Sequence, residues 1–281
     1  MSASEYVFSR DYLDNNRINL QHYLWAELFG YLLHPDIPLT KPDLKIADVA
    51  TGTGILLTDL SRRLPPTVQL DAFDISFDAM PPRELLPPNI TMHKWDVKTD
   101  IPKEFEGIYD VVNVRQLVFV LLDHEVEPAL RNMFKMLRPG GYLQWADVDV
   151  HSMQVKNSNK GSSTTALEKI VKMTQSADPR LVAHWIPELP TLFEKSGFMD
   201  IKADKRNAPG YMGYTLHECV LMVHGMLLQN TKSDEIARRL REPFSEALKE
   251  TYDGAYTDWT RWTVVGRKGG NGFVGFSMVP I

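Results

Sequence analysis

The sequence predicts an α/β fold built on a doubly wound, mostly parallel sheet. Short apolar runs alternate with helical segments between residues 44 and 148, which is the pattern of βαβ units. The runs are continuously hydrophobic, as in parallel strands that are covered on both faces. Helices are therefore expected on both sides of the sheet.

The expected elements follow in chain order. An amphipathic helix over 18–33 carries Leu20, Leu24, Leu28 and Leu32 on one stripe, which is expected to face the core. The core strands are predicted at 44–49, 69–73, 90–95, 108–114 and 141–148, and the core helices at 55–64 and 125–137. The second of these helices is expected to stop at Arg138, Pro139 and Gly140, because proline and glycine end helices.

The remaining segments are expected to cover the site. A helix is predicted at 166–175 and two more within 214–252, and a strand at 259–267 is expected to pair antiparallel with 201–205, closing the sheet edge. The chain is predicted to form a single domain over 1–281. Its parts are an N-terminal helical cap (1–40), a cofactor-binding core (44–148), an acceptor-side and lid region (149–258), a final strand (259–268) and a tail (269–281).

Composition excludes several classes of protein. The formal charge of -5 comes with basic residues scattered along the chain, so no nucleic-acid partner is expected. A single cysteine, Cys219, allows no intramolecular disulfide and no cysteine-rich metal site, and it is expected to be an inert buried thiol. The sequence lacks a secretory signal and any long apolar run, so we expect a soluble, cytoplasmic protein without a membrane partner.

Two glycines stand between the first strand and the helix that follows it. The stretch IADVATGTGILLTDL places Gly52 and Gly54 in this turn, where open α/β sheets bind their ligands. Glycine lets the backbone approach a ligand closely and adopt a positive φ. The alternative interpretation is a purely structural turn.

An acid ends each of the next two strands. Asp74 suits the ribose hydroxyls of a nucleoside, and Asp96 an adenine amino group, with Ile75 and Val97 on either side of the ring. Each acid alone is equally consistent with a solvated loop, but glycine turn, acid and acid at three successive strand ends predict a nucleoside site. Position 57 is Leu and no P-loop occurs, so the nucleoside is expected to lack a pyrophosphate.

These motifs resemble those of class I S-adenosylmethionine-dependent methyltransferases. The resemblance covers about residues 44–148 and ends with LRPGGYLQW (137–145), which matches the turn into the fifth strand. It implies a Rossmann-like sheet of seven strands with helical lid insertions, and S-adenosyl-L-methionine as cofactor. Ala50 replaces the first glycine of the acid-x-G-x-G-x-G motif, a change that we expect to be tolerated. The cofactor-binding residues implied are Asp48, Ala50, Thr51, Gly52, Gly54, Asp74, Ile75, Asp96, Val97, Asn113, Val114 and Arg115.

Two further segments resemble the fungal secondary-metabolite methyltransferases. They are residues 16–38 and LQWADVD at the end of the fifth strand. That branch includes the amide N-methyltransferase of gliotoxin-type pathways and global regulators of secondary metabolism. The resemblance implies methyl transfer to an oxygen or nitrogen of a small-molecule acceptor. A non-catalytic regulator on the same fold, and a cofactor-dependent cyclase that uses the sulfonium charge, are alternatives.

The catalytic residues are less well defined by the sequence. A general base is needed only for an acceptor whose proton must leave early. The candidates are His22, His151, His184 and Asp147. Trp145, Trp185, Met222 and Met226 are candidates for an apolar acceptor pocket, although such residues more often form plain core. Arg115 suits either the cofactor carboxylate or a loop cap.

Overall fold

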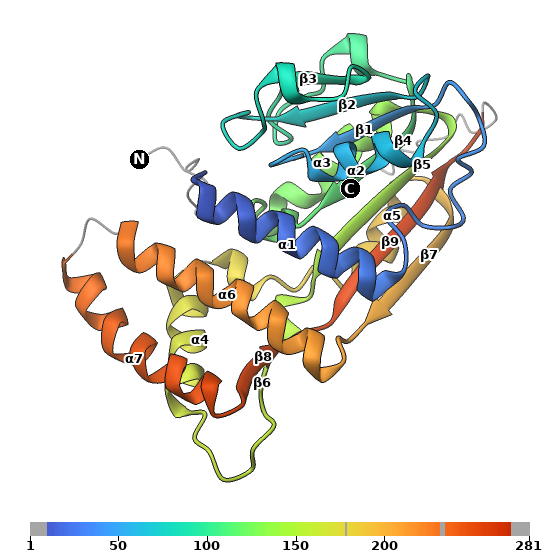
Figure 1. Ribbon diagram of the computed structural model, residues 1–281. Coiled ribbons are helices and arrows are strands. Elements are labelled where there is room, and N and C mark those ends of the chain that lie inside the picture. Colours follow the sequence, from blue (N-terminus) through green and yellow to red (C-terminus); the bar gives the residue numbers. More distant parts are fainter. Residues whose placement is uncertain (1–9, 178, 231–233, 271–281) are drawn as a thin grey trace.

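The computed structural model describes residues 10–177, 179–230 and 234–270 (Figure 1). Its central sheet has seven strands in the order β3-β2-β1-β4-β5-β9-β7. The bounds are β1 Lys45–Val49, β2 Gln69–Asp74, β3 Ile90–Lys94, β4 Tyr109–Arg115, β5 Leu137–Val148, β7 Phe198–Arg206 and β9 Arg261–Lys268. The five strands β1 to β5 are parallel, as the continuous apolar runs predict.

Strand β9 departs from the predicted position while keeping the predicted partner. It pairs antiparallel with β7, and on its other side it pairs antiparallel with β5. It therefore lies inside the sheet, and β7 forms the edge. The side chains of β9 explain this position, because its residues 261–266 are all buried and an edge strand would leave more of them exposed to solvent.

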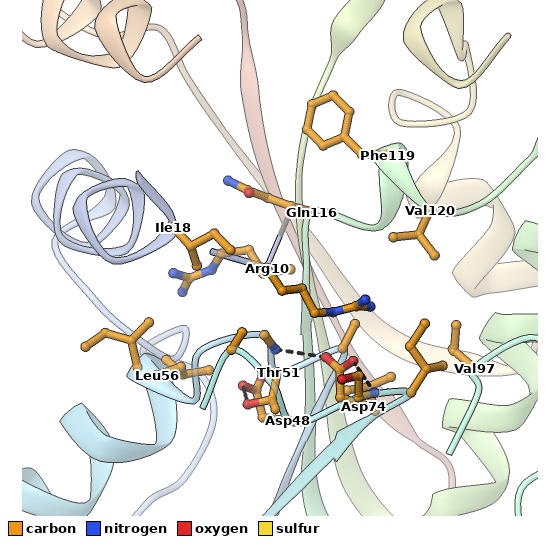
Figure 2. A pocket seen from close by; sticks show the side chains of 18 of the residues that line it. Arg10, Ile18, Asp48, Thr51, Leu56, Asp74, Val97, Gln116, Phe119 and Val120 are labelled. Atoms are coloured by element: carbon orange, nitrogen blue, oxygen red, sulfur yellow. Dashed lines mark hydrogen bonds between the residues drawn. The ribbon is translucent and has the colours of Figure 1, made fainter. Parts of the chain in front are cut away.

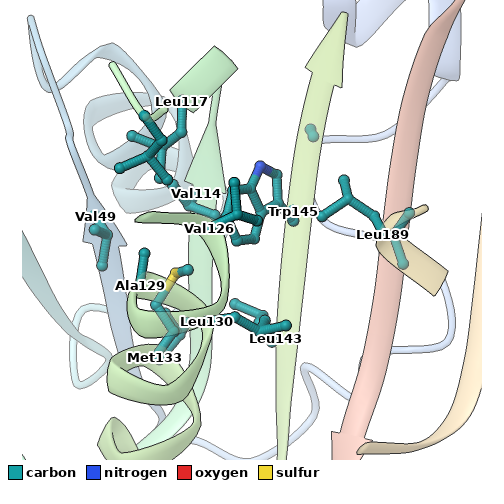
Figure 3. Packing of buried hydrophobic residues seen from close by; sticks show 14 of the residues in the cluster. Val49, Val114, Leu117, Val126, Ala129, Leu130, Met133, Leu143, Trp145 and Leu189 are labelled. Atoms are coloured by element: carbon teal, nitrogen blue, oxygen red, sulfur yellow. The ribbon is translucent and has the colours of Figure 1, made fainter. Parts of the chain in front are cut away.

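Helices cover both faces of the sheet. They are α2 Ile55–Arg63 on one face, and α3 Asp123–Met136 and α5 Leu189–Lys195 on the other. Figure 3 shows Val126, Leu130 and Met133 of α3 packed against the sheet. Successive residues of a strand face opposite sides, so Ile46 joins the apolar cluster under α2 and Ala47 the one under α3.

A second group of elements lies beside the sheet (Figure 1). It consists of α1 Tyr12–Phe29, α4 Thr165–Ala177, α6 Gly210–Asn230, α7 Asp234–Tyr252 and the antiparallel pair β6 Gln154–Asn157 and β8 Ala255–Asp258. Short 3₁₀ helices are η1 Arg83–Leu85, η2 Lys103–Phe105, η3 Leu117–Phe119, η4 Val150–Ser152 and η5 Pro179–Val182. Within the described ranges, no helix has the length and apolarity needed to span a membrane.

The N-terminal helix differs from its prediction. It begins after Asp11, whose side chain accepts hydrogen bonds from two backbone N–H groups, and ends at Gly30 with φ 78°. Its buried residues are Asp14, Arg17, His22, Trp25 and Phe29. Leu20 is 39% exposed, and Leu24 and Leu28 contact the apolar cluster of α6. Leu28 also packs against the core cluster of the sheet, and Leu32, which follows the helix, is buried in the core. The predicted core face is therefore confirmed for Leu28 and Leu32 and wrong for Leu20, because α1 is packed between the sheet and α6.

Candidate functional site

A cavity of about 190 Å³ lies at the carboxyl ends of β1, β2, β3 and β4, with residues of α1 on one side. Parallel strands bring their carboxyl ends to one edge of the sheet, which is why residues distant in sequence meet here. Figure 2 shows Asp48, Thr51 and Asp74 on one wall, Val97 and Val120 beside them, and Ile18 on the side of α1. The side chain of Arg10 extends into this cavity.

The turn after β1 has a left-handed backbone at three positions. The φ angles are 55° at Ala50, 59° at Gly52 and 71° at Gly54. The Gly52 N–H donates to Asp74 Oδ2 at 3.0 Å, so this turn is tied to the end of β2. Gly54 begins α2 and lies outside the cavity, and a Cβ there would meet Met80 Cε at 2.6 Å. Gly52 therefore borders the cavity, whereas Gly54 shapes the start of the helix.

Asp48 supports this turn from beneath. Only 4% of the residue is exposed, and its carboxylate accepts hydrogen bonds from Thr51 Oγ1 at 2.8 Å and Asn113 Nδ2 at 2.7 Å. Burial raises the pKa of Asp48 to about 6, while these two hydrogen bonds act in the opposite direction. Asn113 in turn accepts a hydrogen bond from Gln144 at 2.9 Å. The network joins β1, β4 and β5 under the cavity floor.

The two acids at the strand ends border the same cavity. Asp74 accepts from the backbone N–H groups of Gly52 and Ser76, and burial raises its pKa. Asp96 accepts from the Lys98 N–H at 3.0 Å. Ile75 and Val97 also line the cavity, and Ile75 is 39% exposed there. Asp74, Asp96 and their apolar neighbours are thus close enough to contact one ligand.

Arg115, at the end of β4, places a cation beside this cavity. Its Nη1 donates to His22 Nδ1 at 3.3 Å, and its Cζ lies 5.6 Å from the Trp25 ring centre. Its Nε and Nη2 atoms are buried without a hydrogen-bond partner among the described residues. Burial lowers the pKa of Arg115 to about 10, partly opposed by Asp48, so the guanidinium is still charged at neutral pH. Val114, one residue before it, is buried in the core and does not reach the cavity.

His22 borders the cavity, but both of its ring nitrogens are engaged. Nε2 lies 3.2 Å from Asp59 Oδ2, and Nδ1 faces the guanidinium of Arg115. A guanidinium can only donate, so we assign the Nε2–H tautomer. Burial, followed by the charge of Arg115, lowers the pKa of His22 to about 4. His22 is therefore neutral and positions Arg115, which leaves it no lone pair to serve as a base in this arrangement.

The other three candidate bases lie outside the cavity. Asp147 is fully buried and accepts from the N–H groups of Val118 and Val148 and from Trp145 Nε1. Burial raises its pKa to about 7, and its contacts tie η3 to β5. His151 and His184 are exposed, with ring centres 4.2 Å apart.

The predicted apolar acceptor pocket is not formed by the predicted residues. Trp145 and Trp185 pack against each other in the core with ring centres 5.4 Å apart. Met222 and Met226 lie on α6 and border neither cavity. Cys219 on the same helix is fully buried, and burial raises the pKa of its thiol to about 11, as expected of an inert thiol.

The structure adds residues that sequence reasoning missed. Asp14, Arg17 and Gln21 of α1 border the first cavity, as does Gln116, whose φ is 62°. A second cavity of about 90 Å³ adjoins the first, sharing Arg17, Gln21, Phe119 and Arg180 as lining residues. The leucine stripe predicted within 18–33 does not include Asp14, Arg17 or Gln21, and no local motif marks the residues that line the second cavity.

Comparison with known proteins shows which class of protein this core is similar to. Residues 46–141 match the family model of a methyltransferase domain. This segment contains the glycine turn, both acids and Arg115. The resemblance predicted from the motifs is therefore confirmed for the core of the chain.

Solved structures extend the likeness in fold to nearly the whole chain. A protein of Galdieria sulphuraria, assigned as a sarcosine dimethylglycine methyltransferase, gives a TM-score of 0.52 at 14% identity, covering 95% of this chain and 94% of its own. The phosphoethanolamine N-methyltransferase 2 of Haemonchus contortus, in complex with S-adenosylhomocysteine, also gives 0.52 at 14% identity, over 92% of this chain and 58% of its own. At these identities the likeness shows the fold alone.

Curated relatives are fungal. N-methyltransferase tcpN of Claviceps purpurea is 32% identical over 151 residues, 52% of this chain and 53% of its own. Methyltransferase grgD of a Penicillium species is 37% identical over 145 residues, 48% and 50% of the two chains. Secondary metabolism regulator LAE1 of Hypocrea atroviridis is 26% identical over 147 residues, 52% and 41%. The chain thus spans about half the length of the first two relatives.

Proposed function

We propose that the protein binds S-adenosyl-L-methionine in the first cavity and transfers its methyl group to an oxygen or nitrogen of a small molecule of fungal secondary metabolism. The observation that carries the proposal is the meeting of the glycine turn, Asp74 and Asp96 at one cavity. The predicted cytoplasmic location is part of this proposal. The relatives named N-methyltransferase and methyltransferase, and the neighbour that holds S-adenosylhomocysteine, support it.

The cavity fits the parts of this cofactor. Asp74 would accept hydrogen bonds from the ribose hydroxyls, and Asp96 from the adenine amino group, with the ring between Ile75 and Val97. The backbone around Gly52 would lie against the methionyl part. The carboxylate of that part suits Arg115, whose two buried unpartnered nitrogens would otherwise remain unsatisfied.

Catalysis would depend mainly on position. When bound, the cofactor supplies an electrophilic methyl group and a neutral thioether leaving group. The protein would hold the acceptor heteroatom about 3 to 3.5 Å from that carbon and in line with it, which supplies roughly 7 to 11 kcal/mol. Helix α1 lines one side of the cavity and would help to keep water from competing with the acceptor. Because His22 is neutral and fully engaged, no proton is routed through it here.

Calorimetric titration tests this proposal directly. The protein should bind S-adenosyl-L-methionine and S-adenosylhomocysteine, and Asp74→Ala should weaken binding about 10- to 100-fold, because a charged hydrogen bond contributes about 1.5–3 kcal/mol. Asp78→Ala is the matched control, since Asp78 is exposed and does not border the cavity. Asp74→Asn, which keeps an acceptor for Gly52, checks that a loss of affinity does not come from an unfolded turn.

A regulatory protein on the same fold is the second candidate, and the similarity to LAE1 favours it. Analysis of the reaction products distinguishes a regulatory protein from an enzyme. Incubation with labelled cofactor and a fungal metabolite extract should yield small molecules heavier by one methyl group. Cofactor binding without any transfer would favour the regulator, and an isomerised product of unchanged mass would favour a cyclase. Absence of cofactor binding at millimolar concentration would overturn the proposed function.

A further inference from the structure

The second cavity lies between the sheet and the helices beside it. Its walls come from η3, η4, α4, η5 and α6, with Trp259 after β8. It meets the first cavity where Arg17, Gln21, Phe119 and Arg180 border both. A molecule in the second cavity would therefore have one end near the first, on the side covered by α1.

Most of its walls are apolar. Val150, Val171, Val220, Val223 and Leu181 supply aliphatic surface. An ion without a partner is strongly disfavoured in such surroundings, whereas a neutral apolar molecule gains from burial. The cavity therefore favours an uncharged ligand.

Arg17, at the shared boundary, does not call for an anion. Arg17 donates through Nε to Asp14 Oδ1 at 2.8 Å and through Nη1 to Gln21 Oε1 at 2.8 Å, and its charge is balanced by the carboxylate of Asp14. Arg180 also interacts with another group of the protein. The guanidinium of Arg17 therefore does not depend on a charged ligand for its partner.

One buried polar feature of this cavity is the pair formed by Thr174 of α4 and His224 of α6. His224 is 8% exposed, and its Nδ1 lies 2.9 Å from the carbonyl oxygen of Val220, which can only accept, so Nδ1 carries a hydrogen. Nε2 lies 2.9 Å from Thr174 Oγ1, which is also 2.8 Å from the carbonyl oxygen of Ile170. The one hydroxyl hydrogen is therefore shared between two acceptors.

It follows that the pair has acceptor capacity but no spare hydrogen. Burial lowers the pKa of His224, which keeps the ring neutral, and its Nδ1 hydrogen is committed to Val220. The free capacity is a lone pair on the Thr174 hydroxyl or on His224 Nε2. A ligand group that donates a hydrogen, O–H or N–H, completes this pair, whereas a carbonyl or ether oxygen does not. The Nε1–H of Trp259, which also lines the cavity, is buried without a hydrogen-bond partner among the described residues, so a hydroxyl that can both donate and accept suits the cavity best.

We propose that the second cavity is the acceptor site, and that it takes a neutral, apolar small molecule through one hydroxyl or N–H that donates to the pair of Thr174 and His224. This inference rests on the proposed function and names the class of its acceptor.

Three one-ring probes test the proposed class. Phenol is neutral and donates a hydrogen bond, anisole is neutral without a donor, and benzoate is charged. Saturation-transfer NMR at neutral pH, with the first cavity filled by S-adenosylhomocysteine, should show phenol bound several-fold more tightly than anisole, and benzoate not bound. Anisole or benzoate binding as tightly as phenol would overturn the inference.

Substitutions in the cavity walls test whether phenol binds in this cavity. Val223→Phe from α6 and Val171→Phe from α4 should each fill the cavity and abolish phenol binding, and two walls are used because one variant could fail to fold. Val182→Phe is the matched control, because Val182 follows Leu181 on η5 but is 39% exposed and borders neither cavity. Equal phenol binding by both filled variants and the wild type would contradict the assignment.

The polar pair has its own test. Thr174→Val keeps the size of the side chain and removes the hydroxyl, and should reduce the preference for phenol over anisole to near unity while anisole binding is unchanged. His224→Leu should do the same, and His224→Gln, which retains an acceptor, should restore part of the preference. An unchanged preference in Thr174→Val and His224→Leu would remove the pair from the site.

The experiments distinguish a failure of the proposed acceptor site from a failure of the proposed function. Calorimetry of the same variants should show unchanged cofactor affinity. Cofactor binding with no phenol binding by the wild type would overturn the acceptor site and leave the proposed function standing. Phenol binding without cofactor binding would overturn the proposed function, and with it the role as acceptor site.

Discussion

Ala50 occupies a backbone conformation that alanine rarely adopts. Its φ of 55° lies in the left-handed region, where a residue with a Cβ costs roughly 1–2 kcal/mol relative to the right-handed region. The position is held by its neighbours, because the Thr51 N–H donates to the Phe73 carbonyl and the Gly52 N–H to Asp74. The turn thus keeps its shape with alanine at the first position, although that residue is strained.

Substitution of Ala50 measures this strain. Ala50→Gly relieves the positive φ but adds freedom to the unfolded chain, so the free energy of unfolding should rise by less than about 1 kcal/mol. Ala50→Val adds a β-branch at a positive φ and should lower it by more than about 1 kcal/mol. Urea denaturation gives both values. Ala203→Val, at an exposed position on β7, is the control, and an Ala50→Val variant as stable as the wild type would refute the strain.

Helix α1 borders both cavities. Its His22 bonds to Asp59 of α2, its Asn19 accepts from Thr53 Oγ1 at 2.7 Å, and its Leu24 contacts α6. Because His22 also accepts from Arg115, the position of the helix and that of the guanidinium depend on each other.

Removal of the Asp59 carboxylate should loosen this element. Asp59 is 1% exposed and accepts hydrogen bonds from His22, Arg62 and Arg63. Asp59→Ala leaves the buried His22 Nε2–H without a partner and should lower the free energy of unfolding by about 1–3 kcal/mol, and also weaken cofactor binding through Arg115.

The matched control removes an exposed carboxylate from a helix. Glu127 of α3 pairs with Arg131 at 3.7 Å on the surface, so Glu127→Ala should cost less than about 1 kcal/mol. Chemical denaturation and calorimetry compare the two variants. Equal stability of Asp59→Ala and Glu127→Ala would contradict the role given to Asp59.

The sequence predicts an element well when the contacts that determine it lie within a few residues, and poorly when they come from distant parts of the chain. The strands of the core, the glycine turn and the acids at 74 and 96 follow from patterns within a few residues, and the structure has these strands and places both acids at one cavity. The buried face of α1 does not follow, because it is decided by contact with α6, whose residues begin at Gly210. The position of β9 between β5 and β7 also depends on contacts between residues that are far apart in the sequence, so no local pattern predicts it.

At the scale of the whole molecule the two cavities have different origins. The first is a property of the sheet, whose parallel strands end together. The second is formed by residues of α1, α4 and α6, by the short segments between them and by Trp259. No periodic pattern in the sequence predicts that these segments meet. The residues predicted for an acceptor pocket were large and apolar, and Trp145 and Trp185 are buried core for that reason. The helical group that forms the second cavity is itself held together by buried polar contacts.

His217 of α6 is central to those contacts. It is 1% exposed, its Nδ1 accepts from the Thr257 N–H of β8 at 3.2 Å, and its Nε2 lies 3.0 Å from Thr251 Oγ1 of α7, which donates to the Ala247 carbonyl. The neutral ring with a hydrogen on Nε2 satisfies all of these groups. Nδ1 also lies 3.0 Å from Thr257 Oγ1, and a second hydrogen on Nδ1 would leave the Thr257 N–H without its acceptor.

Stability should therefore fall in acid through His217. Burial, and next the neighbouring His224, lower the pKa of His217 from 6.5 to about 4. Between these values the unfolded chain binds a proton that the folded protein does not, so the free energy of unfolding decreases as the pH falls from 6.5 toward 4. His217→Gln removes the titrating ring and should reduce the loss measured between pH 7.5 and pH 5 by about 2 kcal/mol. His22, whose pKa is also lowered to about 4, still makes the stability of that variant depend on pH. The quantity to compare is therefore the difference in the free energy of unfolding between the variant and the wild type.

Urea denaturation at each pH measures this difference, with His124→Gln at an exposed position on α3 as the control. A variant whose stability declines in acid as steeply as that of the wild type would show that His217 does not link the helices in its neutral form.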